Sequence, residues 1–200
     1  MVSALDTTPW FALARPEEDA AEPPATLLEA CRRGDREAAA ALFDRCRDRV
    51  YTLALHLSAD PAEAADVTQD VFLRVLGRLE QYRGEARFST WLYRVVVNVF
   101  LDRRKARRRY APLDEATLAR RASAEPSPET AAIREQARAR LMAALQRLPD
   151  TLRLPLVLRY GSGLSYGDIA ATLGVREGTV ASRLHRGLAQ LARALATERR

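Results

Sequence analysis

Hydrophobic residues recur with helical spacing along most of the chain, and this pattern predicts an all-α protein. The period begins at Leu27 and continues to about Leu57, with an interruption at Gly34 that separates a short helix from a longer one. A third helix is predicted from Pro61 to Leu79, because proline at the first helical position loses no hydrogen bond.

The next predicted helix is strongly apolar and ends in a basic run. It extends from Trp91 to Leu101, after a break at Gly84, and residues 103–109 follow it with six arginine or lysine side chains. Short connections between these four helices predict one compact domain at residues 26–110. Residues 1–25 contain prolines and an acidic cluster without an apolar period, which indicates a flexible N-terminal tail.

A second helical domain is predicted at residues 133–197. Residues 111–132 hold three prolines among Ala, Ser and Glu, so we expect a flexible linker, with a helical piece around residues 114–121. One apolar stripe then runs from Ile133 to Leu148, and another helix is expected at residues 152–160. Pro155 fits that helix if it lies in the first turn.

The segment from Leu164 to Leu191 has the pattern of a helix-turn-helix. Ser165 precedes Asp168 by three residues, which is a capping-box spacing and predicts a helix start at Tyr166. Gly174 follows the apolar face of that helix, at a position that favours a residue able to adopt a positive φ.

Two stripes are expected on the second helix of this motif. Val180, Leu184, Leu188 and Leu191 form the stripe that should be buried. Another face should be polar and basic, as a helix in the DNA major groove requires. An ordinary solvated helix face is the simpler interpretation, but the cap, the glycine and both stripes together favour DNA binding. The polar face consists of Arg176, Thr179, Ser182, Arg183 and Arg186.

The basic run at residues 103–109 is a second candidate for DNA contact. Cations at a helix C-terminus are stabilised by the helix dipole, yet six in seven residues exceed that need and suggest contact with phosphates. The preceding loop, residues 82–88, combines aromatic residues with Arg83 and Arg87, a combination that suits unstacked bases of a single strand. Phe88 and Trp91 could equally belong to the core.

Composition agrees with a nucleic-acid partner and excludes several other classes. The 200 residues carry a net charge of +6, and almost all of the basic residues are arginine, although a GC-rich genome would produce the same bias. No apolar run is long enough to span a membrane and no secretory signal is visible, so we expect a cytoplasmic protein. Cys31 and Cys46 are too isolated to predict a zinc site or a disulfide framework, and we expect no metal or cofactor.

Three segments resemble the extracytoplasmic-function group of bacterial sigma factors. They are DVTQDVFLRVL at residues 66–76, YRGEARFSTWLYRVVVNVFLDRRKARRR at 82–109 and LVLRYGSGLSYGDIAATLGVREGTVASRLHRGLAQL at 156–191. The third is shared with other transcriptional helix-turn-helix domains, whereas the first two are more specific. Ala181 departs from the family, in which lysine or arginine is frequent at this position.

The resemblance implies two domains, called region 2 and region 4, and a role for each segment. The first helix would bind the β′ clamp helices of core RNA polymerase, region 4 would also touch the β flap, and an anti-sigma factor is expected. The implied polymerase-binding residues are Asp66, Gln69, Asp70 and Arg74. The implied residues for the melted minus-ten element are Tyr82, Arg83, Arg87, Phe88, Ser89, Trp91, Arg94, Asn98, Arg103 and Arg104. The polar face of the second helix, Arg176 to Arg186, would read the minus-35 element.

Two other classes of protein remain as alternatives. A stand-alone helix-turn-helix regulator would explain residues 164–191 but would leave the other two segments without a role. A nuclease would require a metal-spaced cluster of carboxylates or a nucleophile beside a base, and the sequence shows neither. The sequence therefore predicts a DNA-binding polymerase subunit that is not an enzyme.

Overall fold

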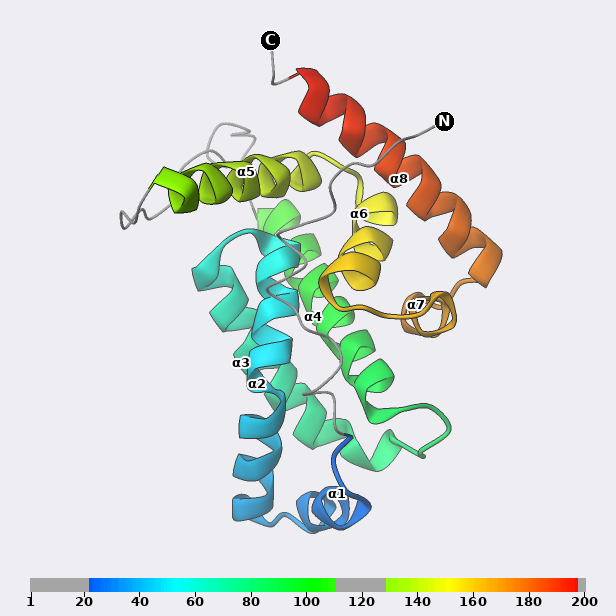
Figure 1. Ribbon diagram of the computed structural model, residues 1–200. Coiled ribbons are helices and arrows are strands. Elements are labelled where there is room, and N and C mark those ends of the chain that lie inside the picture. Colours follow the sequence, from blue (N-terminus) through cyan, green and yellow to red (C-terminus); the bar gives the residue numbers. More distant parts are fainter. Residues whose placement is uncertain (1–21, 111–128, 198–200) are drawn as a thin grey trace.

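Helices make up both halves of the protein. The computed structural model describes residues 22–110 and 129–197, and no strand occurs within these ranges. The first range contains α1 (Ala25–Arg32), α2 (Arg36–Ser58), α3 (Pro61–Arg78), the 3₁₀ turn η2 (Leu79–Gln81) and α4 (Phe88–Tyr110). The second contains α5 (Glu129–Gln146), α6 (Asp150–Leu156), the π-helical segment η3 (Val157–Gly161), α7 (Tyr166–Leu173) and α8 (Glu177–Thr197), as shown in Figure 1.

The predicted all-α class with two helical domains is confirmed. Most of the predicted N-terminal tail and of the linker lies outside the described residues, as does the helical piece expected at 114–121. The part of the expected linker that is described is helical, because α5 already begins at Glu129.

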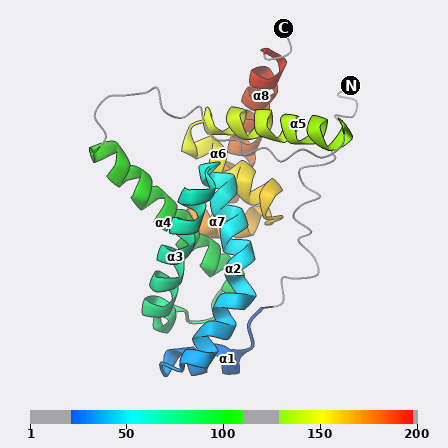
Figure 2. The ribbon, with the colours of Figure 1, turned by 90° about the vertical axis from the view of Figure 1, so that its left-hand side faces the viewer.

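Side-chain caps fix where several helices begin. Asp35 accepts hydrogen bonds from the backbone N–H groups of Glu37 (2.9 Å) and Ala38 (3.1 Å) at the start of α2. Asp60 caps α3 in the same way, and Pro61 occupies its first turn, as the sequence predicted. These two caps fix where α2 and α3 begin, and the two helices pack against each other as an antiparallel pair. The third long helix of the first domain, α4, packs against both (Figure 2).

The core of the first domain lies between α2, α3 and α4. It is mostly aliphatic, with Phe88 and Phe100 also buried in it, and the rings of Phe43 and Phe72 meet edge-on at 4.6 Å. Its deeply buried members include Leu42, Val50, Leu53, Leu57, Val67, Val71, Val75, Leu92 and Val96.

Two expectations for the second domain were wrong. Pro155 is the sixth residue of α6 and therefore lies beyond its first turn; the helix continues only to Leu156 before it widens into the π-helical η3. Leu188 is 42% exposed, and Gly187 takes its place in the buried stripe of α8. At Gly187 an added Cβ would lie 2.9 Å from Leu156 Cδ1, so the absence of a side chain lets α8 approach α6 closely.

The two domains pack against each other. α4 contacts α7, and α2 contacts both η3 and α5, so the buried apolar residues of both domains belong to one continuous cluster. Gln146 Nε2 donates to the backbone oxygen of Leu57 (3.1 Å), and Thr90 Oγ1 donates to Asp168 Oδ1 (3.0 Å). In Figure 1, α6 lies between the first domain and α8.

His56 lies at this interface with a buried ring nitrogen. Its Nδ1 has no hydrogen-bond partner, and an added Cβ at Gly161 of η3 would lie only 2.8 Å from it. Burial lowers the pKa of His56 below its ordinary value of 6.5, and the positive charge of Arg138 adds to this shift. The interface therefore favours the neutral imidazole.

Replacement of Gly187 by alanine should destabilise the protein. The new methyl group would meet Leu156 Cδ1 at 2.9 Å and the Leu152 backbone oxygen at 3.3 Å, so we expect the free energy of unfolding to fall by about 1–3 kcal/mol. Gly178→Ala is the matched control on the same helix, because nothing lies within 4 Å of its added Cβ. Denaturant unfolding should show the stability of this control unchanged or up to about 1 kcal/mol higher. An equal loss of stability in both variants would contradict the close approach of α8 to α6.

Acidification should weaken the folded structure through His56. Because the folded pKa is lowered, the unfolded chain binds the proton more readily, and stability present above pH 6.5 should be lost as the pH falls below it. Urea unfolding of wild type and His56→Gln between about pH 7.5 and about pH 5.5 measures the contribution. We expect a smaller pH dependence in the variant, and an identical dependence would exclude His56 as its source.

Candidate nucleic-acid interface

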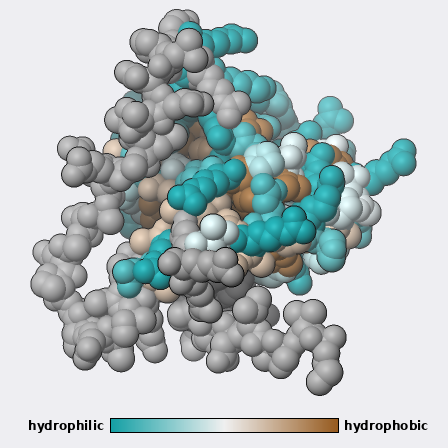
Figure 3. Space-filling model, turned by 90° about the horizontal axis from the view of Figure 1, so that it is seen from above, coloured by the Kyte–Doolittle hydropathy of each residue, from teal (hydrophilic) through white to brown (hydrophobic). Residues whose placement is uncertain are grey.

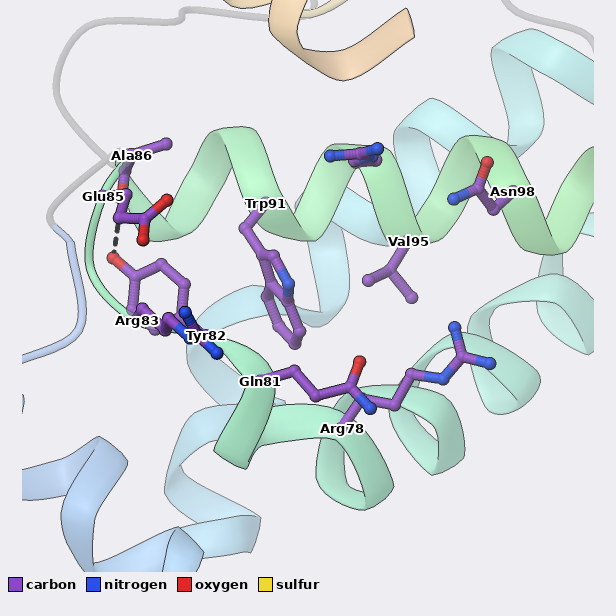
Figure 4. A pocket seen from close by; sticks show the side chains of 10 residues that line it. Arg78, Gln81, Tyr82, Arg83, Glu85, Ala86, Trp91, Val95 and Asn98 are labelled. Carbon is purple, nitrogen blue, oxygen red and sulfur yellow. Dashed lines mark hydrogen bonds between the residues drawn. The ribbon is translucent and has the colours of Figure 1, made fainter. Parts of the chain in front are cut away.

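A cavity of about 440 Å³ lies between the N-terminal half of α4 and the turn that follows α3. Figure 4 shows the Trp91 and Val95 side chains extending from α4 toward Gln81 and Arg78 on the opposite wall. The loop from Tyr82 to Ala86 closes one end of the cavity. The space has the size of a small-ligand pocket and both aromatic and cationic walls.

Three aromatic rings form one side of this site. Tyr82, Phe88 and Trp91 lie with ring centroids 5.4–5.6 Å apart, and Tyr82 and Phe88 meet edge-on. The Tyr82 hydroxyl donates to the backbone oxygen of Ala86 (2.9 Å), which closes the loop upon itself (Figure 4). Phe88 is 1% exposed and supports the cluster from the core, whereas Trp91 is only partly buried and lines the cavity.

The predicted minus-ten residues therefore differ in their access to solvent. Arg83, Arg87, Arg94 and Asn98 are exposed, and all of these except Arg87 line the cavity. Trp91, Arg94 and Asn98 share one face of α4 because they follow helical spacing. An exposed cation and amide beside an aromatic wall can bind phosphate and a base at the same time.

Several residues of this site were missed by the sequence analysis. Arg78 and Gln81 form the second wall of the cavity. Arg32 of α1 supports that wall, since its Nε donates to the Leu79 backbone oxygen (3.3 Å) and its Nη2 to the Tyr82 backbone oxygen (2.7 Å). Nothing in the local sequence of α1 links it to residues 79–82.

The basic run at the end of α4 is largely paired inside the protein. Arg103 bonds both Asp66 and Asp70, Arg107 bonds the nearly buried Glu63 at 2.7 Å, and Arg104 bonds Asp150. These arginines join α4 to α3 and α6, and their positive charges are partly compensated by the carboxylates. Lys105 and Arg109 are exposed.

The same ion pairs shape the surface of α3 that the family resemblance assigns to polymerase. Gln69 is exposed, and Arg74 Nη1 donates to Asp102 Oδ2 at 2.7 Å. Leu73 and Leu76 are 73% and 44% exposed beside these polar residues. An exposed apolar strip bordered by polar groups is typical of a surface that binds another protein.

The cap and the turn glycine of the helix-turn-helix lie where the sequence predicted them. Ser165 Oγ accepts from the Asp168 N–H (3.1 Å) at the start of α7, and Gly174 ends that helix with a φ of +65°. Val180, Leu184 and Leu191 are buried on α8. Arg176, Ser182 and Arg186 are exposed, whereas Thr179 and Arg183 are partly buried.

The surface of the second domain carries many hydrophilic groups. Seen from the end that holds α5 and α8, long hydrophilic side chains project outward with apolar residues visible between them (Figure 3). Within residues 22–110 and 129–197, no three His, Cys, Asp or Glu side chains are grouped so that they could hold a metal ion. None of the described helices combines the length and the apolar character needed to cross a membrane.

The fold and these surfaces define a two-domain helical protein with one aromatic pocket and one helix-turn-helix. The sigma-70 region 2 family matches residues 42–110, and the sigma-70 region 4 family matches residues 138–191. The chain is 44% identical over 146 residues to the ECF RNA polymerase sigma factor SigE of Mycolicibacterium smegmatis, over 72% of this chain and 56% of that protein. It is 34% identical to the RNA polymerase sigma-H factor of Pseudomonas aeruginosa, over 84% of this chain and 92% of that protein.

A solved structure shares the arrangement of helices. The sigma factor RpoE of Bartonella quintana, in its co-crystal structure with the anti-sigma factor NepR, superposes with a TM-score of 0.57 at 22% identity. The similarity covers 86% of this chain and 92% of that one. The chain belongs to the extracytoplasmic-function (ECF) group of the sigma-70 family of RNA polymerase sigma factors.

Removal of the Arg186 side chain should weaken binding to duplex DNA. Its guanidinium is exposed on the polar face of α8, where Nε donates to the Ser182 backbone oxygen (3.3 Å), so Arg186→Ala should cost about 1–3 kcal/mol if the side chain reads a base. Arg193→Ala removes the same charge from an exposed position two turns further along the helix. Gel-shift titration with duplex genomic fragments compares the DNA affinities of the two variants. An equal loss of affinity in both would mean that Arg186 contributes only through its charge.

Proposed function

We propose that this chain is a sigma subunit that binds core RNA polymerase and directs promoter recognition, DNA melting and transcription initiation. The observation that carries the proposal is the presence, in one chain, of an aromatic pocket suited to an unstacked base and a helix-turn-helix suited to duplex DNA. A factor that melts a promoter needs both, because it must hold one strand open while it stays anchored on double-stranded DNA. The chain performs no catalytic step in this scheme, and its place of action is the cytoplasm.

The first domain, proposed to span residues 26–110, would bind the melted minus-ten element. A base displaced from the stack would enter between Trp91 and Gln81, and Arg83 and Arg94 would hold the flanking backbone. Phe88 and Thr90 would act through the shape of α4, because both are buried. Arg103 and Arg104 are paired with carboxylates of Asp66, Asp70 and Asp150. They would contact DNA only after these ion pairs break.

The second domain, proposed to span residues 133–197, would read the minus-35 element through the polar face of α8. Exposed Arg176, Ser182 and Arg186 on that face can donate to base edges or phosphates in the major groove. Two modest interactions on one chain gain strength from effective concentration once both domains are seated on one polymerase.

The protein partners proposed are core polymerase and an anti-sigma factor. Asp66, Gln69, Asp70 and Arg74 on α3 would meet the β′ clamp helices, with Leu73 adding apolar contact beside them. The second domain would also touch the β flap. An anti-sigma factor is proposed because the similar factor from Bartonella quintana was solved with one.

Binding to core polymerase separates this proposal from a stand-alone helix-turn-helix regulator. A tagged chain should capture core polymerase and support run-off transcription from a pool of genomic fragments, whereas a regulator that acts without polymerase would bind fragments and capture no polymerase. The transcripts would also identify the promoter. Failure to capture polymerase would overturn the proposal.

The α3 surface can be tested within the same assay. Gln69→Ala, combined with Asp66→Ala, should weaken polymerase binding by about 1–3 kcal/mol because both side chains are exposed on the proposed contact surface. Asp48→Ala is the control, since it removes an exposed carboxylate from a different helix, α2. The melting temperature of each variant should be measured, because Asp66 also bonds Arg103. Equal binding by the control and the double variant would contradict the assignment.

A further inference from the structure

The N-terminus of α4 is capped by a residue that is distant in the sequence. Ala86 and Arg87, directly before the helix, have no side-chain acceptor for its first N–H groups. Instead, the backbone N–H of Ser89 lies 3.3 Å from Glu22 Oε1 and 3.4 Å from Glu22 Oε2. A carboxylate 67 residues earlier in the chain therefore occupies the position of a helix cap.

The same carboxylate also holds a cation of the proposed minus-ten loop. Arg87 Nε lies 3.4 Å from Glu22 Oε1, with the Arg87 side chain 64% exposed and that of Glu22 32% exposed. Burial raises the pKa of the Tyr82 phenol, and the negative charge of Glu22 contributes to this shift. Because Arg87 directly follows Ala86 of the cavity wall, Glu22 lies beside the loop that closes this end of the cavity.

We propose that Glu22 is an intramolecular competitor of the DNA strand, occupying an anion position that a backbone phosphate takes when single-stranded DNA enters the pocket. This inference rests on the proposed function of the pocket. A helix N-terminus with a free N–H and an exposed arginine beside it attracts a phosphate for the same reasons that it attracts a carboxylate. Both anions cannot occupy it together, so strand binding displaces Glu22.

Capping of α4 does not by itself require a carboxylate at this place. A neutral Ser or Asn just before the helix would cap α4 equally well without competing with phosphate. The competition gives Glu22 a role in setting the affinity of the free subunit for DNA.

The proposal is tested by neutralising the carboxylate without changing its size. The full chain, wild type or Glu22→Gln, is titrated into a fluorescein-labelled, random-sequence single strand of about 12 nucleotides, and anisotropy is followed at several salt concentrations. We expect the Glu22→Gln variant to bind about threefold to tenfold more tightly, with a steeper dependence on salt, because one more phosphate is held. The gain should vanish when Arg87→Ala is added, because that arginine would receive the phosphate.

Glu80→Gln is the matched control. Glu80 is an exposed carboxylate on η2, and its neutralisation changes the net charge by the same amount while leaving the contacts of Glu22 with Ser89 and Arg87 in place. An equal gain in both variants would overturn the proposal in favour of a general charge effect. A lower melting temperature of Glu22→Gln without tighter binding would overturn it in favour of a purely structural cap.

A third variant separates failure of this inference from failure of the proposed function. If Trp91→Ala abolishes strand binding while Glu22→Gln binds like wild type, the pocket binds DNA and the competition is wrong. If wild type, Glu22→Gln and Trp91→Ala all fail to bind the strand, or if Trp91→Ala binds like wild type, the pocket assignment itself is wrong and the competition falls with it.

Discussion

Arg153 is the buried charge around which the two domains pack. Its side chain is 1% exposed, and burial, with the nearby positive charge of Arg104, lowers its pKa to about 10, so it remains protonated at neutral pH. A buried cation must be paired, or its desolvation costs several kcal/mol. Asp150 and Gln146 accept from its guanidinium, and the Phe100 ring lies 5.4 Å away. Phe100 belongs to α4, so the first domain supplies the aromatic face of this site, whereas both hydrogen-bonding partners come from the second domain and Nε has none.

This constraint ties the two proposed DNA surfaces to one helix. α4 packs its apolar face on α2 and α3, lines the cavity with Trp91, and bonds α7 through Thr90. Arg104 joins the network by bonding Asp150, so a residue of the basic run is held by the second domain. Movement of the helix-turn-helix away from the first domain must break the Arg104 and Thr90 contacts and uncover the face of Phe100 that packs on Arg153. Separation of the two domains therefore costs the free energy of these specific contacts.

Local sequence patterns predicted the helices and where several of them begin and end. Helical period, the helix start at Pro61, the Ser165 cap and the φ requirement at Gly174 each depend on a few consecutive residues, and the structure has all of them. Pro155 was misplaced because α6 starts at Asp150, which puts the proline beyond the first turn. Leu188 was misplaced because the close approach of α6 selects Gly187 for the buried stripe of α8.

The candidate site divides in the same way. The sequence by itself determined that α4 presents Trp91, Arg94 and Asn98 on one face, because helical spacing fixes that relation. Only the tertiary structure decided that Gln81 forms the opposite wall, that the basic run is paired with carboxylates of α3 and α6, and that the two domains share a core. Each of these depends on side chains brought together from distant segments, and their meeting is set by the packing of whole helices, which no local pattern records.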